Sequence, residues 1–280
     1  MTEKGFLAPP EIAGAAVEIG VKKAESGALY LLVLGFLAGA FIAFAAEGSN
    51  MAAYNLLARP ETYGLGKCLA GAIFGTGLML VIGAGGELFT GNNLLLLAMW
   101  QKRISPYQLV RNWMLVYAGN LLGSLFIAWL MIGGGLFSSS NGLLGGMTVK
   151  IAAYKTSLPV FSAVALGILC NMLVCGAVWM SYGAKDLTGK LLACFFPIWL
   201  FITSGFEHSV ANMYYIPAGI WAKADPVYAA ASGLGAEALA GLNWGTFITN
   251  NLVPVSLGNI IGGGLIFGGA YWLAYLRGEK

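Results

Sequence analysis

Charge is scarce in this sequence: Asp, Glu, Lys and Arg make up only 10% of its 280 residues, whereas a soluble domain has about 25%. The mean hydropathy is +0.77. The net charge is only +3, and the basic residues fall between apolar runs instead of forming the stripe that nucleic acid requires. We therefore expect a membrane protein that is solvated by the lipid bilayer and has no nucleic-acid partner.

Metal-binding and redox motifs are missing as well. The four cysteines lie inside apolar stretches at spacings that match no zinc or redox motif, and His208 is the only histidine. Residues 1–27 hold seven charges and no apolar core of the signal-peptide type. The sequence thus predicts no metal, no cofactor and no cleaved leader.

The lengths of the apolar stretches predict six spans. A transmembrane helix needs roughly 20 apolar residues, and four stretches fit this length simply. Two more are too long for one span and too short for two spans with a turn, which predicts helices that are broken inside the membrane. The simple spans are 29–46, 109–132, 160–180 and 246–275, and the broken ones lie within 67–102 and 190–223.

Polar residues mark both predicted breaks, with Glu87 in the first and Glu207 beside His208 in the second. Non-helical backbone at membrane depth is tolerated only where it faces protein or a watery cavity, so both breaks should line a path. If the second half-helices begin near Thr90 and Ser209, their hydroxyl groups would cap the first turns and the free N–H groups would attract anions. We expect each glutamate to accept hydrogen bonds from freed backbone N–H groups.

The two halves of the chain resemble each other. LGFLAG at 34–39 matches LGILCN at 166–171, and GNLLGS in the third span matches GNIIGGG in the sixth. Three spans per unit predict an inverted repeat, at about 28–135 and 158–276, with the permeation path at the repeat interface.

A cytoplasmic amphipathic helix is expected within residues 1–27, ahead of a single channel domain at 28–280. Proline at its start and apolar residues along one side suit a helix at the membrane interface. The predicted inner segments hold ten basic residues, Lys4 and Lys280 among them, and the outer segments hold five. This imbalance predicts a multi-pass protein with both termini in the cytoplasm.

The lone histidine is the strongest candidate for a functional side chain. His208 is either a hydrogen-bonded core residue or a group in the path, where it would hold an anion or lend it a proton so that it crosses as a neutral weak acid. Lys155, just outside the fourth span, would concentrate anions at the mouth or would simply be a solvated lysine.

Bulky apolar residues surround both breaks. Phe74, Leu78, Leu88 and Phe201 are packing residues by default. If they face the path, they form hydrophobic constrictions that impede hydrated ions and leave room for small, easily desolvated solutes.

Several long segments are similar to signature segments of the formate/nitrite transporter family. They are SGFEHSVANM at 204–213, GGELFTGN at 85–92, MLVYAGNLLGS at 114–124 and NLVPVSLGNIIGGG at 251–264. The resemblance covers the chain from about Ile12 onward. It implies an all-α, aquaporin-like fold of six transmembrane helices in a three-plus-three inverted repeat, with the second and fifth helices broken, assembled as a homopentamer with one pore through each protomer.

The resemblance also implies roles for individual residues. His208 corresponds to the central histidine, Thr90 to the threonine that hydrogen-bonds near it, and Glu207 to the residue that orients the histidine loop. Lys155 matches the basic residue of the outer vestibule, and the amino-terminal helix would gate the inner mouth. Leu78 and Phe201 would form the cytoplasmic slit and Phe74 and Leu88 the periplasmic slit, with Asn171 and Asn259 as polar groups between or beside them.

The sequence predicts a channel, not an enzyme, for small monovalent anions across the bacterial inner membrane. The stretches 213–220 and 251–259 look like those of formate-type members, which favours formate, with hydrosulfide and nitrite as alternatives. A water or glycerol channel is disfavoured because both breaks lack paired Asn-Pro-Ala motifs. A membrane-embedded enzyme would have only Glu87, Glu207 and His208 as metal ligands, and one histidine with two carboxylates is a weak set of ligands for a metal site. A cation pathway along the two glutamates is a further alternative.

Overall fold

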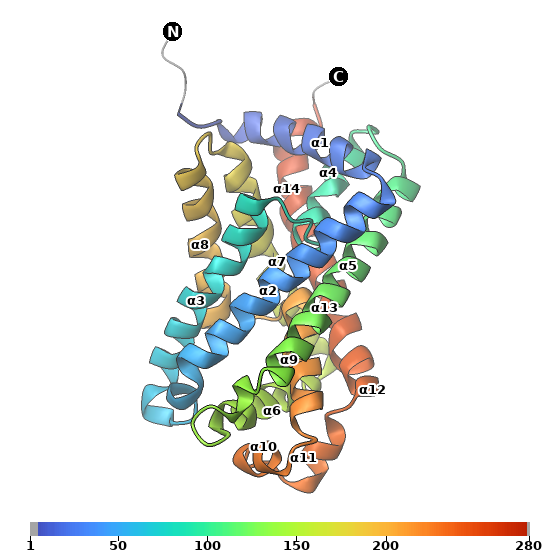
Figure 1. The fold of residues 1–280 in the computed structure, drawn as a ribbon. Helices are drawn as coiled ribbons and strands as arrows, with labels where there is room; N and C mark the ends of the chain where they lie inside the picture. Colours follow the sequence, from blue (N-terminus) through green and yellow to red (C-terminus); the bar gives the residue numbers. More distant parts are fainter. Residues whose placement is uncertain (1–4, 279–280) are drawn as a thin grey trace.

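A computed structural model describes residues 5–278 of the protein and is helical from end to end (Figure 1). Within these residues the only β-structure is a single bridge between Phe6 and Ala184. Two cations counted for the membrane orientation, Lys4 and Lys280, lie outside the described residues. Within the described residues, six helices are long and apolar enough to cross a membrane, as predicted: Ala28–Leu57, Pro60–Ala84, Pro106–Gly133, Val160–Gly183, Leu187–Ser204 and Trp244–Leu276.

The second and fifth spans are interrupted. Helix α3 (Tyr63–Ala84) ends at Gly85, whose φ is 87°, and α8 (Leu187–Ser204) ends at Gly205, whose φ is 80°. Glycine readily adopts this left-handed conformation and so terminates both helices. The chain then passes through a short loop into a second helical piece. These pieces are η2 (Gly91–Leu94) with α4 (Leu95–Trp100), and α9 (Ser209–Ala222).

The uninterrupted helices of each half pack at very short distances. In the first half, α2 (Ala28–Leu57) crosses α5 (Pro106–Gly133), and a methyl group added to Gly123 would lie 1.9 Å from the Phe36 carbonyl oxygen. In the second half, α7 (Val160–Gly183) crosses the long last helix. A methyl group on Gly262 would lie 2.1 Å from the Ile168 carbonyl oxygen. Glycine permits these close backbone contacts in the membrane. The last helix comprises α12 (Trp244–Thr246), η4 (Phe247–Leu252), α13 (Val253–Asn259), η5 (Ile260–Gly268), α14 (Gly269–Tyr271) and η6 (Trp272–Leu276).

The amino-terminal helix α1 (Pro9–Glu25) lies across the same end of the molecule as the end of η6 (Figure 1). Its apolar side, which the sequence assigned to the membrane interface, packs on the protein itself. A methyl group on Gly183 of α7 would lie 2.6 Å from Ile12, and one on Gly20 would lie 3.0 Å from Ala98 of α4. Helix α1 is therefore built into the transmembrane body.

Helix α6 (Leu143–Thr156) lies at the opposite end, in a segment where the sequence predicted only a connection. It packs on α9, where a methyl group on Gly219 would lie 2.2 Å from Ala152. Helix α6 thus covers α9, the second helical piece of the fifth span, in the same way that α1 covers α4 of the second span. The division of the chain into residues 1–27 and a channel domain at 28–280 stays a prediction. The remaining short helices are η1 (Pro60–Thr62), η3 (Leu136–Ser138), α10 (Pro226–Ala231) and α11 (Ala236–Gly241).

Candidate functional site

The first break is held by a network around Glu87. Lys23 Nζ of α1 lies 3.1 Å from Glu87 Oε2 and donates a 2.8 Å hydrogen bond to Asn92 Oδ1. Asn92 Nδ2 donates to Glu87 Oε2 at 2.8 Å and to Asn112 Oδ1 at 2.9 Å, and Asn112 donates to the Lys23 carbonyl oxygen at 3.0 Å. The buried carboxylate therefore has a cation and an amide as partners, which offsets the cost of burying its charge.

The second break has the same network around Glu207. Lys155 Nζ, in the last turn of α6, lies 2.7 Å from Glu207 Oε1. Asn212 Nδ2 donates to Glu207 Oε2 and to Asn251 Oδ1, both at 2.7 Å, and Asn251 donates to the Lys155 carbonyl oxygen at 2.9 Å. Lys155 also lies over the ring of Tyr215, with Nζ 5.3 Å from the centroid. It is thus paired, not freely solvated.

One asparagine holds the backbone of each loop. Asn120 Oδ1 accepts from the Phe89 N–H at 3.0 Å, and its Nδ2 donates to the carbonyl oxygens of Gly35 and Glu87 at 2.8 and 2.9 Å. The freed backbone groups are therefore satisfied by an asparagine, and the expectation that the glutamates accept backbone N–H groups is wrong, because lysine and asparagine side chains occupy both carboxylates. In the second loop, Asn259 Oδ1 accepts from the Ser209 N–H at 2.9 Å, and its Nδ2 donates to the carbonyl oxygens of Gly167 and Glu207 at 2.9 and 3.1 Å.

The two loops meet at Thr90 and His208. Thr90 Oγ1 lies 2.9 Å from His208 Nε2, and both residues are buried. His208 Nδ1 accepts the Ala211 N–H at 3.0 Å. A backbone N–H can only donate, so Nδ1 carries no proton here, and a neutral imidazole must carry its proton on Nε2. His208 therefore presents an N–H group to the Thr90 hydroxyl.

Capping of the second half-helices differs from the sequence-based expectation. Thr90 makes no capping bond, and Ser209 Oγ has no hydrogen-bond partner among residues 5–278. The imidazole of His208 takes the place expected of the serine hydroxyl because His208 is the N-cap residue itself. The Thr90 hydroxyl is left to contact the histidine.

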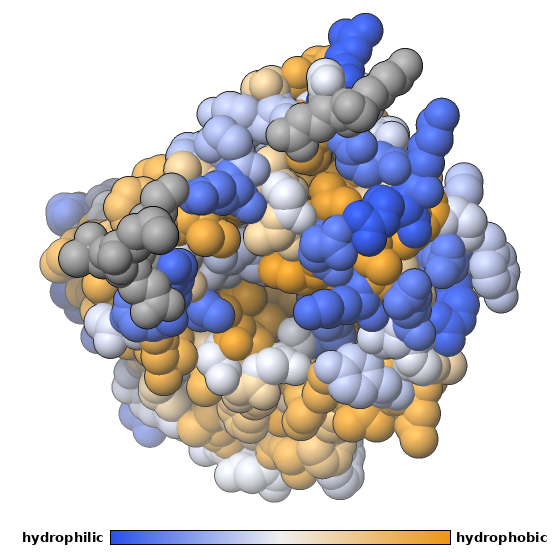
Figure 2. Space-filling model, turned by 90° about the horizontal axis from the view of Figure 1, so that it is seen from above, coloured by the Kyte–Doolittle hydropathy of each residue, from blue (hydrophilic) through white to orange (hydrophobic). Residues whose placement is uncertain are grey.

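Two cavities approach this contact from opposite ends. The α1-side cavity, of about 290 Å³, is lined by Lys23, Leu78, Glu87, Leu88 and Lys190 among others. From the α1 end, Figure 2 shows hydrophilic residues around a hollow with an apolar floor. The α6-side cavity, of about 280 Å³, is lined by polar and charged residues that include Asn50, Lys67, Lys150, Lys155, Glu207 and Tyr215.

An aromatic layer separates the two cavities. Along α3, Ala70 lines the α6-side cavity and Leu78 lines the α1-side cavity, with Phe74 one turn from each. The ring centroids of Phe74 and Phe201 are 5.8 Å apart, and those of Phe201 and His208 are also 5.8 Å apart. All three rings are almost completely buried. The layer is therefore apolar except for the polar groups of the Thr90–His208 contact.

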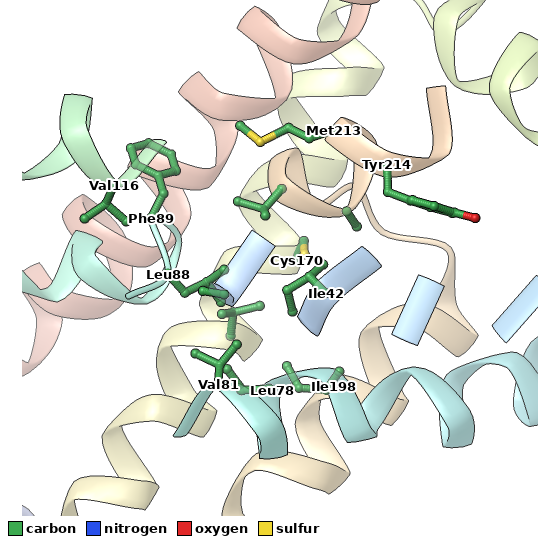
Figure 3. Packing of buried hydrophobic residues seen from close by; sticks show 14 of the residues in the cluster. Ile42, Leu78, Val81, Leu88, Phe89, Val116, Cys170, Ile198, Met213 and Tyr214 are labelled. Carbon is green, nitrogen blue, oxygen red and sulfur yellow. The ribbon is translucent and has the colours of Figure 1, made fainter. Parts of the chain in front are cut away.

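Two of the four predicted constriction residues line a cavity, and the other two contact each other. Leu78 and Leu88 both line the α1-side cavity and lie together with Val81 (Figure 3). Phe74 and Phe201 instead contact each other. Leu88 lines the cavity that contains Lys23. The slits of Leu78 with Phe201 and of Phe74 with Leu88 stay predictions.

Asn171 lies behind the contact, not in either cavity. Its Nδ2 donates to the carbonyl oxygens of Thr90 at 3.2 Å and Asn259 at 2.7 Å. Cys175 Sγ also donates to the Thr90 carbonyl, at 3.4 Å. Asn171 and Asn259 thus join the two loops to the long helices and position Thr90 and His208.

Sequence reasoning missed Lys67 as a cavity residue. Lys67 Nζ forms no hydrogen bond or ion pair within residues 5–278, although the residue is only partly exposed on the cavity wall. A signal was available, since Lys67 is the last cation before the aromatic layer on α3. No group of three or more His, Cys, Asp or Glu in the described part of the chain could hold a metal ion.

Residues 10–273 match the family model of the formate/nitrite transporters. The chain belongs to the formate/nitrite transporter family. It is 41% identical over 274 residues to the formate channel FocA of Escherichia coli, covering 97% of this chain and 95% of the relative. It is 37% identical to a probable formate transporter of Methanothermobacter thermautotrophicus, covering 97% and 98%. The family confirms the resemblance seen in the sequence motifs and a multi-pass membrane protein.

Solved structures give the same result. A pentameric formate channel with formate bound matches with a TM-score of 0.81 at 41% identity, covering 89% of this chain and 98% of that chain. An ion channel of the formate/nitrite transporter family matches with a TM-score of 0.79 at 30% identity, covering 94% and 98%. The predicted all-helical fold of six membrane helices is thus confirmed as that of the family.

Proposed function

We propose that this member of the formate/nitrite transporter family conducts formate through the Thr90–His208 contact. The observation that carries the proposal is the 2.9 Å contact itself, which is the polar point of an apolar layer between two lysine-lined cavities. Both termini lie on the cytoplasmic side of a bacterial inner membrane in this proposal, so the α1-side cavity faces the cytoplasm.

Electrostatics draw anions toward the layer from either side. The α6-side cavity has three lysines, Lys67, Lys150 and Lys155, against one carboxylate, Glu207. The α1-side cavity has Lys23 and Lys190 against Glu87. Cavities with one dominant sign of charge and low-dielectric walls raise the local concentration of oppositely charged solutes. Formate therefore accumulates next to the constriction.

The apolar layer selects solutes that lose water easily. Phe74 and Phe201 offer no replacement for the hydration shell of an ion, so strongly hydrated ions are impeded. The N–H group on His208 Nε2 donates to the Thr90 hydroxyl in the closed contact and is free to donate to a formate oxygen when the contact opens. Because Nδ1 caps α9, we assign His208 as a hydrogen-bond donor and not as a proton donor.

The surrounding residues act by position in this proposal. Glu87 and Glu207 hold the loops, since the carboxylate of each binds a lysine and an asparagine side chain. Asn171 and Asn259 fix the loop carrying Thr90 and the loop carrying His208. Relatives at 41% and 37% identity are named as formate channels and transporters, not as enzymes, which supports formate as the substrate. We propose a homopentamer by likeness to the pentameric structure.

Uptake of labelled formate, nitrite, hydrosulfide and lactate by proteoliposomes tests the proposal. We expect formate uptake well above that of empty liposomes, and higher rates for formate than for the larger lactate. Osmotic swelling measured on the same vesicles separates an anion path from a water path. Formate uptake equal to that of empty liposomes, or water flux without formate flux, would overturn the proposal.

A further inference from the structure

A carboxyl group lies deep in α2, apart from both break networks. Glu47 is 3% exposed, and the Tyr214 hydroxyl of α9 donates a hydrogen bond to its Oε2. Its Oε1 is buried and has no hydrogen-bond partner within residues 5–278, and no ion pair of Glu47 is formed there. Burying an unpaired carboxylate costs several kcal/mol. Glu47 therefore needs either a proton or a partner from outside the chain.

The next turn of α2 connects Glu47 to the α6-side cavity. Asn50 follows Glu47 by three residues and so lies on the same side of the helix. Asn50 is also 3% exposed, its Nδ2 has no partner within the described chain, and the residue lines the cavity together with Ser49. A water molecule that accepts from Asn50 Nδ2 and donates to Glu47 Oε1 would satisfy both atoms.

The surroundings offer Glu47 one hydrogen bond and several nearby charges. Tyr214 holds one oxygen and points its hydroxyl away from the hydrophobic core cluster (Figure 3). Lys155 on the cavity wall is already bound to Glu207. Helix α5 gives Glu47 no hydrogen bond or ion pair among residues 5–278. The titratable groups around the niche are Tyr214, which binds Glu47, and those that line the cavity: Tyr63, Lys67, Lys150, Tyr154, Lys155, Glu207 and Tyr215.

We propose that Glu47 is a proton-exchange site on the wall of the α6-side cavity, reached from the cavity through Asn50 and water. A hydronium ion in the cavity gives its proton to the Glu47 carboxylate, leaving water and a neutral carboxyl group. In the reverse step the proton passes to a weak-acid anion in the cavity and restores the carboxylate. The second step rests on the proposed function, since it takes formate as the anion and gives formic acid.

Infrared difference spectroscopy of the reconstituted protein tests the site without transport. Subtracting the spectrum of Glu47→Gln from that of the intact chain should leave the C=O band of a protonated carboxyl group. That band should shift in D2O, because water reaches the site. The control variant Glu237→Gln, altered at an exposed position of α11, should keep the band. A missing band at every pH at which the protein is folded, or a band that D2O leaves in place, would overturn the proposal.

Transport then separates this inference from the proposed function. Labelled formate and internal pH are followed together in vesicles. We expect Glu47→Gln to lower proton entry during formate uptake several-fold, whereas Glu237→Gln has no effect. Tyr214→Phe keeps the ring and removes the hydroxyl that binds Glu47. Its rate of proton entry should lie between those of the intact chain and Glu47→Gln, which shows whether a loss of proton entry comes from misfolding. Proton entry that is unchanged in Glu47→Gln contradicts the proton site alone. An intact chain that moves no formate contradicts the proposed function and leaves the infrared result standing.

Discussion

The two break loops share a scaffold and differ in chemistry. In each loop a lysine, a glutamate and two asparagines form one network, and a further asparagine ties the loop backbone to a long helix. The residue after the glutamate is Leu88 in the first loop and His208 in the second, and two positions further on stand Thr90 and Val210. Each loop thus supplies one polar partner of the central contact, and neither loop forms it alone.

This difference shows which features belong to the fold and which to the path. The contacts that both loops share are those that an inverted repeat predicts. They include the contacts that α1 and α6 make through Lys23 and Lys155. The unmatched residues gather at the point where the loops meet. Substitutions at matched positions should therefore affect stability in pairs, whereas substitutions at unmatched positions should affect transport.

The largest expected effect comes from the glycines at the helix crossings. Gly123→Ala and Gly262→Ala would each place a methyl group within 1.9 or 2.1 Å of a carbonyl oxygen. Because the obstacle is backbone, the helices must separate, and we expect each change to cost at least about 3 kcal/mol. Thermal unfolding in detergent measures the loss. Gly133→Ala, with nothing within 4 Å of the added methyl group, is the control and should be neutral or slightly stabilising; equal losses in all three would refute the crossing argument.

The two buried ion pairs should differ in strength. Lys155→Met leaves the Glu207 side chain, 2% exposed, without its cation, and we expect a loss of about 3–5 kcal/mol. Lys23→Met should cost less, since the side chains of Lys23 and Glu87 are 21% and 8% exposed. The double variant Lys155→Met with Glu207→Gln should recover part of the loss. Unfolding midpoints compare the variants, and a larger loss for Lys23→Met would reverse the comparison.

The two cavities should differ in their dependence on single lysines. Lys67 has no partner in the described chain and lies on the α6-side cavity, so Lys67→Met should lower formate uptake from that side about tenfold at low ionic strength. Added salt should narrow the difference because it screens the field. Lys67→Arg keeps the charge and serves as the control. Initial uptake rates at several salt concentrations measure the effect, and a salt-independent loss would indicate a structural role instead.

The smallest expected effect concerns the contact of α1 with the turn after α4. Arg103 bonds Glu18 at 2.6 and 3.2 Å and lowers the pKa of that carboxyl group below its ordinary value. The contact therefore stabilises the fold above the ordinary pKa of glutamate, and this stability is lost as pH falls through the lowered pKa. Both side chains are about half exposed, so the gain is small. Unfolding midpoints of the intact chain and Glu18→Gln should converge on acidification; a widening gap would contradict this assignment.

Much of the fold could be predicted from apolar length and polar interruptions. The six spans follow from runs of apolar residues, and Glu87 and Glu207 fall just after the points where α3 and α8 end. Helix α6 could not be found in this way, since its glycines and lysines do not make an apolar run. A weaker signal existed, because Lys23 and Lys155 stand at equal distances before Leu34 and Leu166.

The site was less predictable because its contacts join distant parts of the chain. The partner of Glu87 is Lys23, 64 residues away, and composition cannot name such a pair. The side toward which Leu88 points depends on the loop backbone, which periodicity does not describe. Glu47 is a lone acid in an apolar run, and its role depends on Tyr214, 167 residues away. Thr90 and His208 were found through their places in the two predicted breaks and then through the family motifs, not through their contact.

Formate uptake by His208→Leu and His208→Asn tests the central contact most directly. The leucine variant gives the second loop the residue that the first loop has at Leu88 and removes the donor from the apolar layer. We expect it to lose at least about tenfold in uptake, the equivalent of one hydrogen bond, while the asparagine variant, which keeps a donor, retains most of the activity. Uptake by a folded His208→Leu protein at the rate of the intact chain would contradict the account.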